Sequence, residues 1–218
     1  MTGLRLAIFD MDDVLCVYDR DIRIEALARL SGRSPDQILR AIWHSGFEAL
    51  SDAGRLDAAA YLAGFGKRLG YPITRAEWVS IRKLGMRPSP EVLALVRRVK
   101  ERAEIALLSN NGLLAAEEME RLFPELPPLF GERIFVSGMF GTKKPDPAIY
   151  RALTARLGFA PEEAFFTDDK PRNVHGAETA GLTGHIFRNV AGLREALVDH
   201  GLLAEEGAAP LPILAAER

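Results

Sequence analysis

The chain has 218 residues, of which 48% are hydrophobic and 27% charged, with a formal net charge of −2. This composition is typical of a globular protein with one domain, or one domain carrying a smaller insertion. The near-neutral charge argues against nucleic acid or an anionic membrane surface as a partner. No stretch approaches the roughly 18 apolar residues that span a membrane.

The start of the chain does not resemble a signal peptide, because Asp10 interrupts its apolar run too early. Cys16 is the single cysteine, so it cannot form an internal disulfide. A single free thiol fits a reducing compartment. We therefore expect a cytoplasmic protein in which Cys16 is an unreactive, partly buried thiol.

The apolar residues 4–9 predict a buried strand that stops at three acids: Asp10, Asp12 and Asp13. Clustered carboxylates at the end of a buried strand repel each other and are costly to desolvate. A divalent cation relieves that cost, and a cation beside a free carboxylate oxygen is also a site for phosphoryl transfer. Because Asp10 and Asp12 are two residues apart, both point the same way in an extended chain, and Met11 points into the protein.

Residues 17–87 contain no convincing strand and predict an all-helical insertion. Thr74 and Glu77 form a capping box in this region. We expect a helical cap domain over 17–87 and a catalytic core formed by 1–16 and 88–218. The expected cap helices are 21–30, 35–50, 58–69 and 75–84.

From residue 89 onward, short apolar runs alternate with helical patterns, which indicates an α/β fold with a mainly parallel sheet. Residues 204–218 predict a frayed end or a packing arm. The expected strands are 105–108, 134–136, 164–167 and 185–188. The expected helices are 89–102, 113–122, 147–157, 174–180 and 193–200.

Polar groups follow the expected strands at the edge where parallel sheets bind ligands. They are Ser109 with Asn110, Lys144, and the pair Asp168 and Asp169. Taken singly, each has a structural explanation as a helix cap, a solvated charge or a turn. Together with Asp10 and Asp12 they supply a nucleophile, an acid–base group, a hydroxyl with amides, an ammonium and metal ligands, which phosphoryl transfer needs.

Four segments resemble the motifs of the haloacid dehalogenase-like (HAD) superfamily in order and spacing. They are DMDDV at 10–14, LLSNN at 107–111, GTKKPDP at 141–147 and FFTDDKPRN at 165–173. The resemblance extends from about residue 4 to 188 and implies a Rossmann-like core with a C1-type helical cap. The last two segments look most like the branch with sugar-phosphate phosphatases and the phosphatase domain of soluble epoxide hydrolases.

The resemblance also implies roles for the site residues. Asp10 would be the nucleophile and a Mg²⁺ ligand. Asp12 would be the general acid and then the general base, with its backbone carbonyl on the metal. The further implied roles are phosphoryl binding by Ser109 and the amide of Asn110, charge neutralisation by Lys144, metal ligation by Asp169 with Asp168 assisting, and support by Asn173.

Two features discriminate within the superfamily. Its dehalogenases lack an acid at the position of Asp12 and a metal-binding pair such as Asp168 and Asp169, so the resemblance argues against dehalogenation. Its phosphonate hydrolases use a cap lysine, and neither Lys67 nor Lys83 lies in a recognisable context.

Position 13 departs from the pattern, since Asp13 stands where the family usually has glycine. Aspartate tolerates an unusual backbone angle but adds negative charge, and we expect its side chain to point outward. In the cap, Trp43, His44 and Phe47 are weak candidates for substrate contact, and packing roles explain them as well.

We therefore predict a Mg²⁺-dependent phosphomonoester hydrolase that acts through an aspartyl-phosphate intermediate. The expected substrate is a small phosphorylated metabolite, a sugar phosphate by branch resemblance, and the expected state is a monomer or homodimer without nucleic-acid or membrane partners. The alternatives are a phosphomutase of the same family and a non-catalytic binding module.

Overall fold

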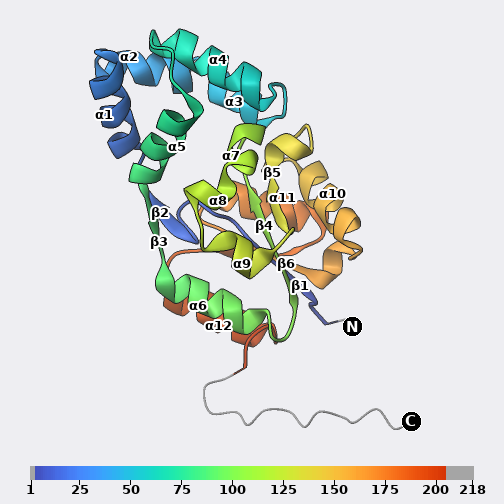
Figure 1. Ribbon diagram of the computed structural model, residues 1–218. Coiled ribbons are helices and arrows are strands. Elements are labelled where there is room, and N and C mark those ends of the chain that lie inside the picture. The colour runs from blue at the N-terminus through green and yellow to red at the C-terminus, as the bar shows by residue number, and fades with distance from the viewer. Residues whose placement is uncertain (1–2, 205–218) are drawn as a thin grey trace.

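A computed structural model describes residues 3–204, and the predicted tail lies outside this range apart from its first residue. The described chain forms one five-stranded parallel sheet in the order β5-β4-β1-β6-β7. This confirms the predicted α/β class (Figure 1). The strands are β1 (Leu6–Phe9), β4 (Glu104–Ser109), β5 (Ile134–Val136), β6 (Ala164–Asp168) and β7 (Thr183–Ile186).

Helices cover both faces of this sheet. Successive residues of a strand point to opposite faces, so Leu6 and Ile8 pack into one apolar cluster, and Ala7 and Phe9 into another. The first cluster is covered by α10 (Pro147–Leu157) and α11 (Pro171–Ala180). The second is covered by α6 (Pro90–Val99), α8 (Met119–Leu122), α9 (Leu126–Phe130) and α12 (Val190–Asp199).

Residues 20–84 form a helical unit, called the insert here, which lies beyond the carboxyl edge of the sheet (Figure 1). Its own apolar core also includes Leu114 and Leu122 from the helices below it. It consists of α1 (Arg20–Ser31), α2 (Pro35–Ile38), the π-helical η1 (Leu39–His44), α3 (Phe47–Asp52), α4 (Ala58–Leu69) and α5 (Arg75–Leu84).

The expectation that 17–87 holds no strand is wrong at both ends. The short strands β2 (Cys16–Tyr18) and β3 (Met86–Pro88) pair antiparallel and join the insert to the core. Each is only three residues long, too short to show an alternating pattern in sequence. The predicted boundaries at 17 and 87 fall inside this ribbon.

Two predicted helices are interrupted. The expected helix 35–50 becomes α2, η1 and α3, and the break before α3 lies at Gly46, which takes a left-handed backbone conformation with φ of 77°. The expected helix 113–122 is divided at Glu118 into α7 (Leu113–Glu117) and α8. The remaining short elements, the 3₁₀ turns η2 (Ser137–Met139) and η3 (Pro161–Glu163) and helix α9, were not predicted.

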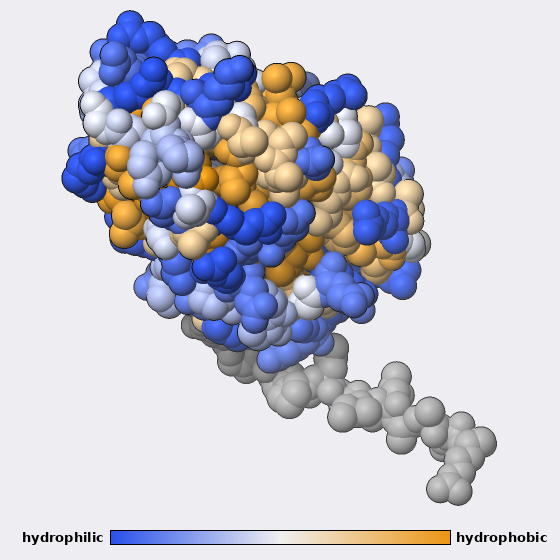
Figure 2. Space-filling view, turned by 45° about the horizontal axis from the view of Figure 1, so that its top comes forward, coloured by the Kyte–Doolittle hydropathy of each residue, from blue (hydrophilic) through white to orange (hydrophobic). Residues whose placement is uncertain are grey.

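Figure 2 is turned so that the insert comes toward the viewer. On this face, hydrophilic residues dominate the rim and apolar residues gather toward the middle. Exposed large apolar side chains include Leu50 in the insert and Met139 in the core. Among residues 3–204, no helix combines the length and the apolar character needed to cross a membrane.

Candidate active site

Sheet register brings the acidic ends of β1 and β6 together. Phe9 pairs with Thr167, and the backbone N–H of Asp10 donates to the carbonyl of Thr167 at 3.0 Å. Asp10 and Asp168 therefore extend side by side from the carboxyl edge. Ser109 ends β4, on the other side of β1. The predicted convergence of these groups at one edge is what the fold produces.

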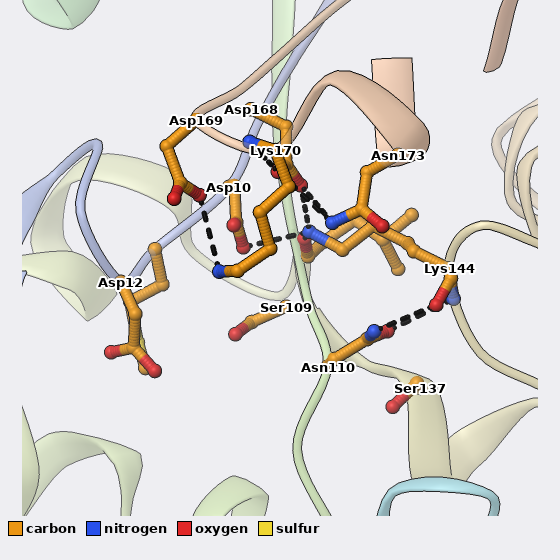
Figure 3. Close-up of polar contacts among 12 residues, drawn as sticks. Asp10, Asp12, Ser109, Asn110, Ser137, Lys144, Asp168, Asp169, Lys170 and Asn173 are labelled. Carbon is orange, nitrogen blue, oxygen red and sulfur yellow. Dashed lines mark hydrogen bonds and ion pairs between the residues drawn. The ribbon is translucent and has the colours of Figure 1, made fainter. Parts of the chain in front are cut away.

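Lys144 lies between the two carboxylates. Its Nζ is 2.8 Å from Oδ1 of Asp10 and 2.6 Å from Oδ2 of Asp168, and it also donates to the carbonyl of Leu108 at 2.9 Å (Figure 3). Asn110 holds the Lys144 backbone by two hydrogen bonds of 2.9 Å, one donated by its Nδ2 and one accepted by its Oδ1. The ammonium is thus buried and fixed in place.

Asp168 is fully buried but well compensated. Nδ2 of Asn173 donates to both its carboxylate oxygens at 2.9 Å, and the backbone N–H of Lys170 donates to Oδ1. Burial works to raise the pKa of Asp168, but the charge and hydrogen bond of Lys144 outweigh it and hold the pKa below its usual range. The carboxylate is therefore an ionised anchor for the ammonium.

Asp10 has the opposite balance. Burial raises the pKa of Asp10 to about 8, and the negative charges of Asp168 and Asp12 add to this although Lys144 opposes it. One ammonium is shared between two buried acids, so a second positive charge is needed to keep Asp10 ionised near neutral pH.

Asp169 completes a set of oxygens that fits a divalent cation. One carboxylate oxygen each from Asp10, Asp168 and Asp169 lies within 4.8 Å of the other two. Mg²⁺ prefers such hard oxygen ligands. In this structure, Nζ of Lys170 lies 3.2 Å from Oδ1 of Asp169 and partly offsets its charge (Figure 3). The donor set and its excess of negative charge both fit a bound cation.

Asp12 lies apart from this set. Its Oδ2 is 3.4 Å from Nη2 of Arg82, which belongs to α5 of the insert. Asp12 and Asp10 nevertheless line the same pocket, whose volume is about 290 Å³. Asp12 therefore contacts the insert and also lines the pocket at the sheet edge, so it is within reach of a group bound there.

A family model described as haloacid dehalogenase-like hydrolase matches residues 4–181. The chain belongs to this family. The match covers four of the five strands of the sheet, their acidic edge and the insert, so the resemblance of the four sequence segments is confirmed at the level of the family.

Several curated relatives of this hydrolase are named phosphatases. A phosphoserine phosphatase of Thermus thermophilus is 29% identical over 187 residues, which are 84% of this chain but only 61% of that protein. A phosphatase of Mycobacterium tuberculosis is 24% identical over 206 residues, 90% of this chain and 93% of the relative. A D-ribitol-5-phosphate phosphatase of Bacteroides thetaiotaomicron is 24% identical over 199 residues, which are 87% of this chain and 95% of the relative.

Solved structures confirm the fold. A HAD family enzyme of Bacteroides thetaiotaomicron, crystallised with magnesium and inorganic phosphate, has a TM-score of 0.74 at 22% identity and covers 85% of this chain and 95% of its own. A HAD-like hydrolase of Porphyromonas gingivalis has a TM-score of 0.75 at 22% identity and covers 91% and 98%.

In this HAD-like hydrolase, Asp10 and Lys144 at the sheet edge line the pocket, and Asp168 and Asp169 lie directly against them. These four residues are called the floor. The insert supplies the roof, defined as Arg20, Arg23, Trp43, Glu48, Asp52 and Arg82. Trp43 lines the pocket as a substrate contact must. His44 is exposed and Phe47 is buried against Tyr61, with ring centroids 5.4 Å apart, and neither lines the pocket.

The loop after β1 explains the aspartate at position 13. Asp13 has a left-handed backbone with φ of 65°, which aspartate tolerates better than most residues. Its exposed side chain accepts a hydrogen bond from the backbone N–H of Tyr18 at 3.1 Å.

The burial of two neighbouring residues was also predicted. Met11 is fully buried, as expected from the alternation of side chains in an extended chain. Cys16 is 1% exposed, more buried than expected, and burial raises its pKa, which disfavours the reactive thiolate.

Sequence reasoning missed the charged residues that surround the floor. Lys170 lies inside the fourth motif, next to the two aspartates, so its position was a usable signal. Arg23 and Arg82 carry no comparable signal, because they lie on helical patterns in which arginine is ordinarily solvated. Both are buried in the structure.

Proposed function

We propose that this chain is a Mg²⁺-dependent phosphomonoester hydrolase for small phosphorylated metabolites. The observation that carries the proposal is the buried ammonium of Lys144 between Asp10 and Asp168, with Asp169 completing a cation-binding set. The phosphatase relatives support the same reaction class.

Asp10 is the nucleophile of the proposed reaction. Its carboxylate oxygen attacks phosphorus, the bond to the leaving oxygen breaks, and the phosphoryl group becomes an acyl phosphate on Asp10. Water then attacks this phosphorus and restores the carboxylate. The ammonium of Lys144, 2.8 Å from Oδ1 of Asp10, reduces the repulsion between carboxylate and phosphate.

Asp12 is the proposed acid and base. In the first step it gives its proton to the leaving alkoxide, and in the second it takes a proton from the attacking water. Ser109 and the backbone amide of Asn110 lie at the end of β4 and would hold phosphoryl oxygens. Since the side chain of Asn110 is engaged by Lys144, only its backbone is free for this role.

The cation would be held by Asp10, Asp168 and Asp169, with the Asp12 carbonyl as a further ligand. When bound, it would supply positive charge that lets an anionic nucleophile approach an anionic phosphoryl group. A magnesium and phosphate complex of a structural relative supports this choice of metal.

The pocket limits the substrate. Its volume of about 290 Å³ is at the small end of ligand sites, and the insert covers it. A phosphoprotein or a nucleic acid is too large. A sugar phosphate remains the expectation from branch resemblance, and the ribitol phosphate activity named for one relative is compatible with it.

The test is phosphate release from a panel of phosphorylated sugars, acids and nucleotides, with a generic aryl phosphate, in Mg²⁺ and in EDTA. Release should require Mg²⁺ and fall by about 10³-fold or more in Asp10→Asn. Asp21→Asn, an exposed aspartate at the start of α1, is the matched control and should keep full activity. Isomerisation of a sugar phosphate without phosphate release would instead identify a mutase, and the absence of both reactions would contradict the proposal.

A further inference from the structure

Arg23 is a buried cation that the proposed reaction does not use. It lies on α1, is 1% exposed, and forms no ion pair within the described residues. Its guanidinium lies 5.3 to 5.5 Å from the ring centroids of Trp43, Phe65 and Trp78. Arginine is almost never fully buried unless it is paired, so this placement calls for an explanation.

One edge of the Arg23 guanidinium lacks a partner. Nη1 donates to the hydroxyl of Tyr18 at 3.3 Å, but Nη2 is buried and has no hydrogen-bond partner. Leaving a charged donor unsatisfied costs more than leaving a neutral one. Because Arg23 lines the same pocket as Asp10, a bound group can supply the missing acceptor. Nε of Arg82, in the same roof, is also buried without a partner.

The acids of the roof do not pair with Arg23. Glu48 already accepts a hydrogen bond from the hydroxyl of Tyr61 at 2.6 Å. Burial, with the nearby charge of Glu48, raises the pKa of Asp52 to about 7, so its carboxyl is partly neutral near neutral pH. Arg82 is paired with Asp12 at 3.4 Å, whereas no carboxylate of the described residues pairs with Arg23. The position beside Arg23 therefore favours an anion.

We propose that Arg23 forms a subsite for a carboxylate on the substrate, so that the substrates are small phosphorylated carboxylic acids. This rests on the proposed phosphatase function and narrows it. The phosphoryl group binds at the floor and the carboxylate at the roof. A guanidinium binds a carboxylate by charge-assisted hydrogen bonds, which the hydroxyls of a neutral sugar cannot match. The aromatic rings around Arg23 exclude water and strengthen the interaction.

A matched pair of substrates tests this. 3-Phosphoglycerate and glycerol 3-phosphate share one carbon skeleton and differ in a carboxylate against a hydroxymethyl group. The wild-type hydrolase should favour 3-phosphoglycerate in kcat/KM by about tenfold or more. Arg23→Met should remove most of that preference, with kcat/KM falling about tenfold further for 3-phosphoglycerate than for glycerol 3-phosphate, because only the carboxylate loses its partner.

Two further variants separate charge from packing. Arg23→Lys keeps the positive charge and should retain part of the preference. Arg29→Met makes the same substitution on the same helix at a side chain that is 70% exposed, and should leave both substrates unchanged. If Arg23→Met lowers kcat/KM for both substrates by the same factor, Arg23 only packs the insert and the proposal is overturned.

A binding measurement tests the subsite without relying on the Arg23→Met variant. The two tryptophans of the chain, Trp43 and Trp78, both lie against Arg23, so their fluorescence reports on this subsite. In the Asp10→Asn protein, 3-phosphoglycerate should bind about tenfold or more tightly than glycerol 3-phosphate. Equal affinities overturn the subsite, whether or not Arg23→Met folds.

The hydrolysis and binding measurements together distinguish the carboxylate subsite from the phosphatase function. Hydrolysis of both substrates at equal rates overturns the carboxylate subsite and leaves the phosphatase function standing. No hydrolysis of any phosphoester, together with tighter binding of 3-phosphoglycerate, overturns the phosphatase function and supports the subsite.

Discussion

The floor and the roof of the pocket treat buried charge in opposite ways. On the floor, the ammonium of Lys144 contacts Asp10 and Asp168 at 2.8 and 2.6 Å, and Asn173 and Lys170 complete the hydrogen bonds of Asp168. In the roof, Arg23 and Arg82 each keep a buried donor without a partner.

The difference follows from the supporting structure. Floor residues extend from strands whose register is fixed by the sheet, so their mutual distances are set before any ligand arrives. Roof residues come from the helices of the insert, which pack around aromatic rings and are not held by the register of a sheet. In the proposed function, the floor would carry out the reaction and the roof would select the substrate.

The largest expected effect is on the floor. Lys144→Met leaves two buried carboxylates without their counter-charge, and in EDTA it should lower the free energy of unfolding by about 3–5 kcal/mol and abolish activity. Urea denaturation measures the first effect. Lys143→Met, at the half-buried neighbouring lysine, should cost less than about 1 kcal/mol. Equal losses in the two variants would show that the floor does not depend on this ion pair.

Metal binding gives the next largest effect. At a Mg²⁺ concentration about 100 times its dissociation constant, the free energy of unfolding should rise by about 2.7 kcal/mol. Asp169→Asn should lose more than half of this gain, because one of the three cation ligands is neutralised. Thermal unfolding in Mg²⁺ and in EDTA measures the gain. An unchanged gain would remove Asp169 from the metal site.

The contact between insert and core is tested by two glycines with similar backbones. Gly54 has φ of 69° and a Cβ there would lie 2.4 Å from the carbonyl oxygen of Gly138, whereas Gly46 has φ of 77° and open space around it. Both alanine variants carry the same backbone strain, so Gly54→Ala should cost about 1–3 kcal/mol more than Gly46→Ala. Urea denaturation of the pair provides the comparison, and kcat/KM should fall further in Gly54→Ala. Equal stabilities would mean that the insert does not close as tightly as the structure has it.

The smallest expected effect concerns Asp52 in the roof. Its folded pKa of about 7 lies above the ordinary value of 3.8, so the folded state holds a proton that the unfolded state releases as pH rises from about 4 to 7. Wild-type stability therefore falls across this window, and Asp52→Asn should be more stable than wild type at pH 8. The gain is about 1 kcal/mol after allowance for partial exposure, and it should vanish below pH 4. Denaturation at both pH values measures it, and a gain that persists at pH 3.5 would exclude ionisation as its cause.

The sequence was informative where local pattern and chemistry coincide. Asp10, Ser109, Lys144 and Asp168 follow apolar runs, and strands of a parallel sheet end at a common edge, so their convergence was predictable without coordinates. The predicted ranges of helices α4 and α5 coincide with the observed ones, because Asp57 and Thr74 cap these helices by side-chain hydrogen bonds.

Other features depended on contacts distant in sequence. The ribbon of β2 and β3 pairs Cys16 with Pro88, and a strand of three residues gains its hydrogen bonds only from that distant partner. The break between η1 and α3 lies at Gly46, where the chain takes one of several backbone conformations open to glycine.

By itself, the sequence determined the α/β class, the order of the elements and the acidic edge, because periodicity and the residues that end each strand are local properties. Only the tertiary structure decided that Lys144 bridges two acids and that Asp12 faces Arg82. It also decided that Arg23 is buried with one hydrogen-bond donor unsatisfied. Burial and pairing of a charge depend on which residues fold around it, and a helical pattern alone does not record whether an arginine meets water or an aromatic ring.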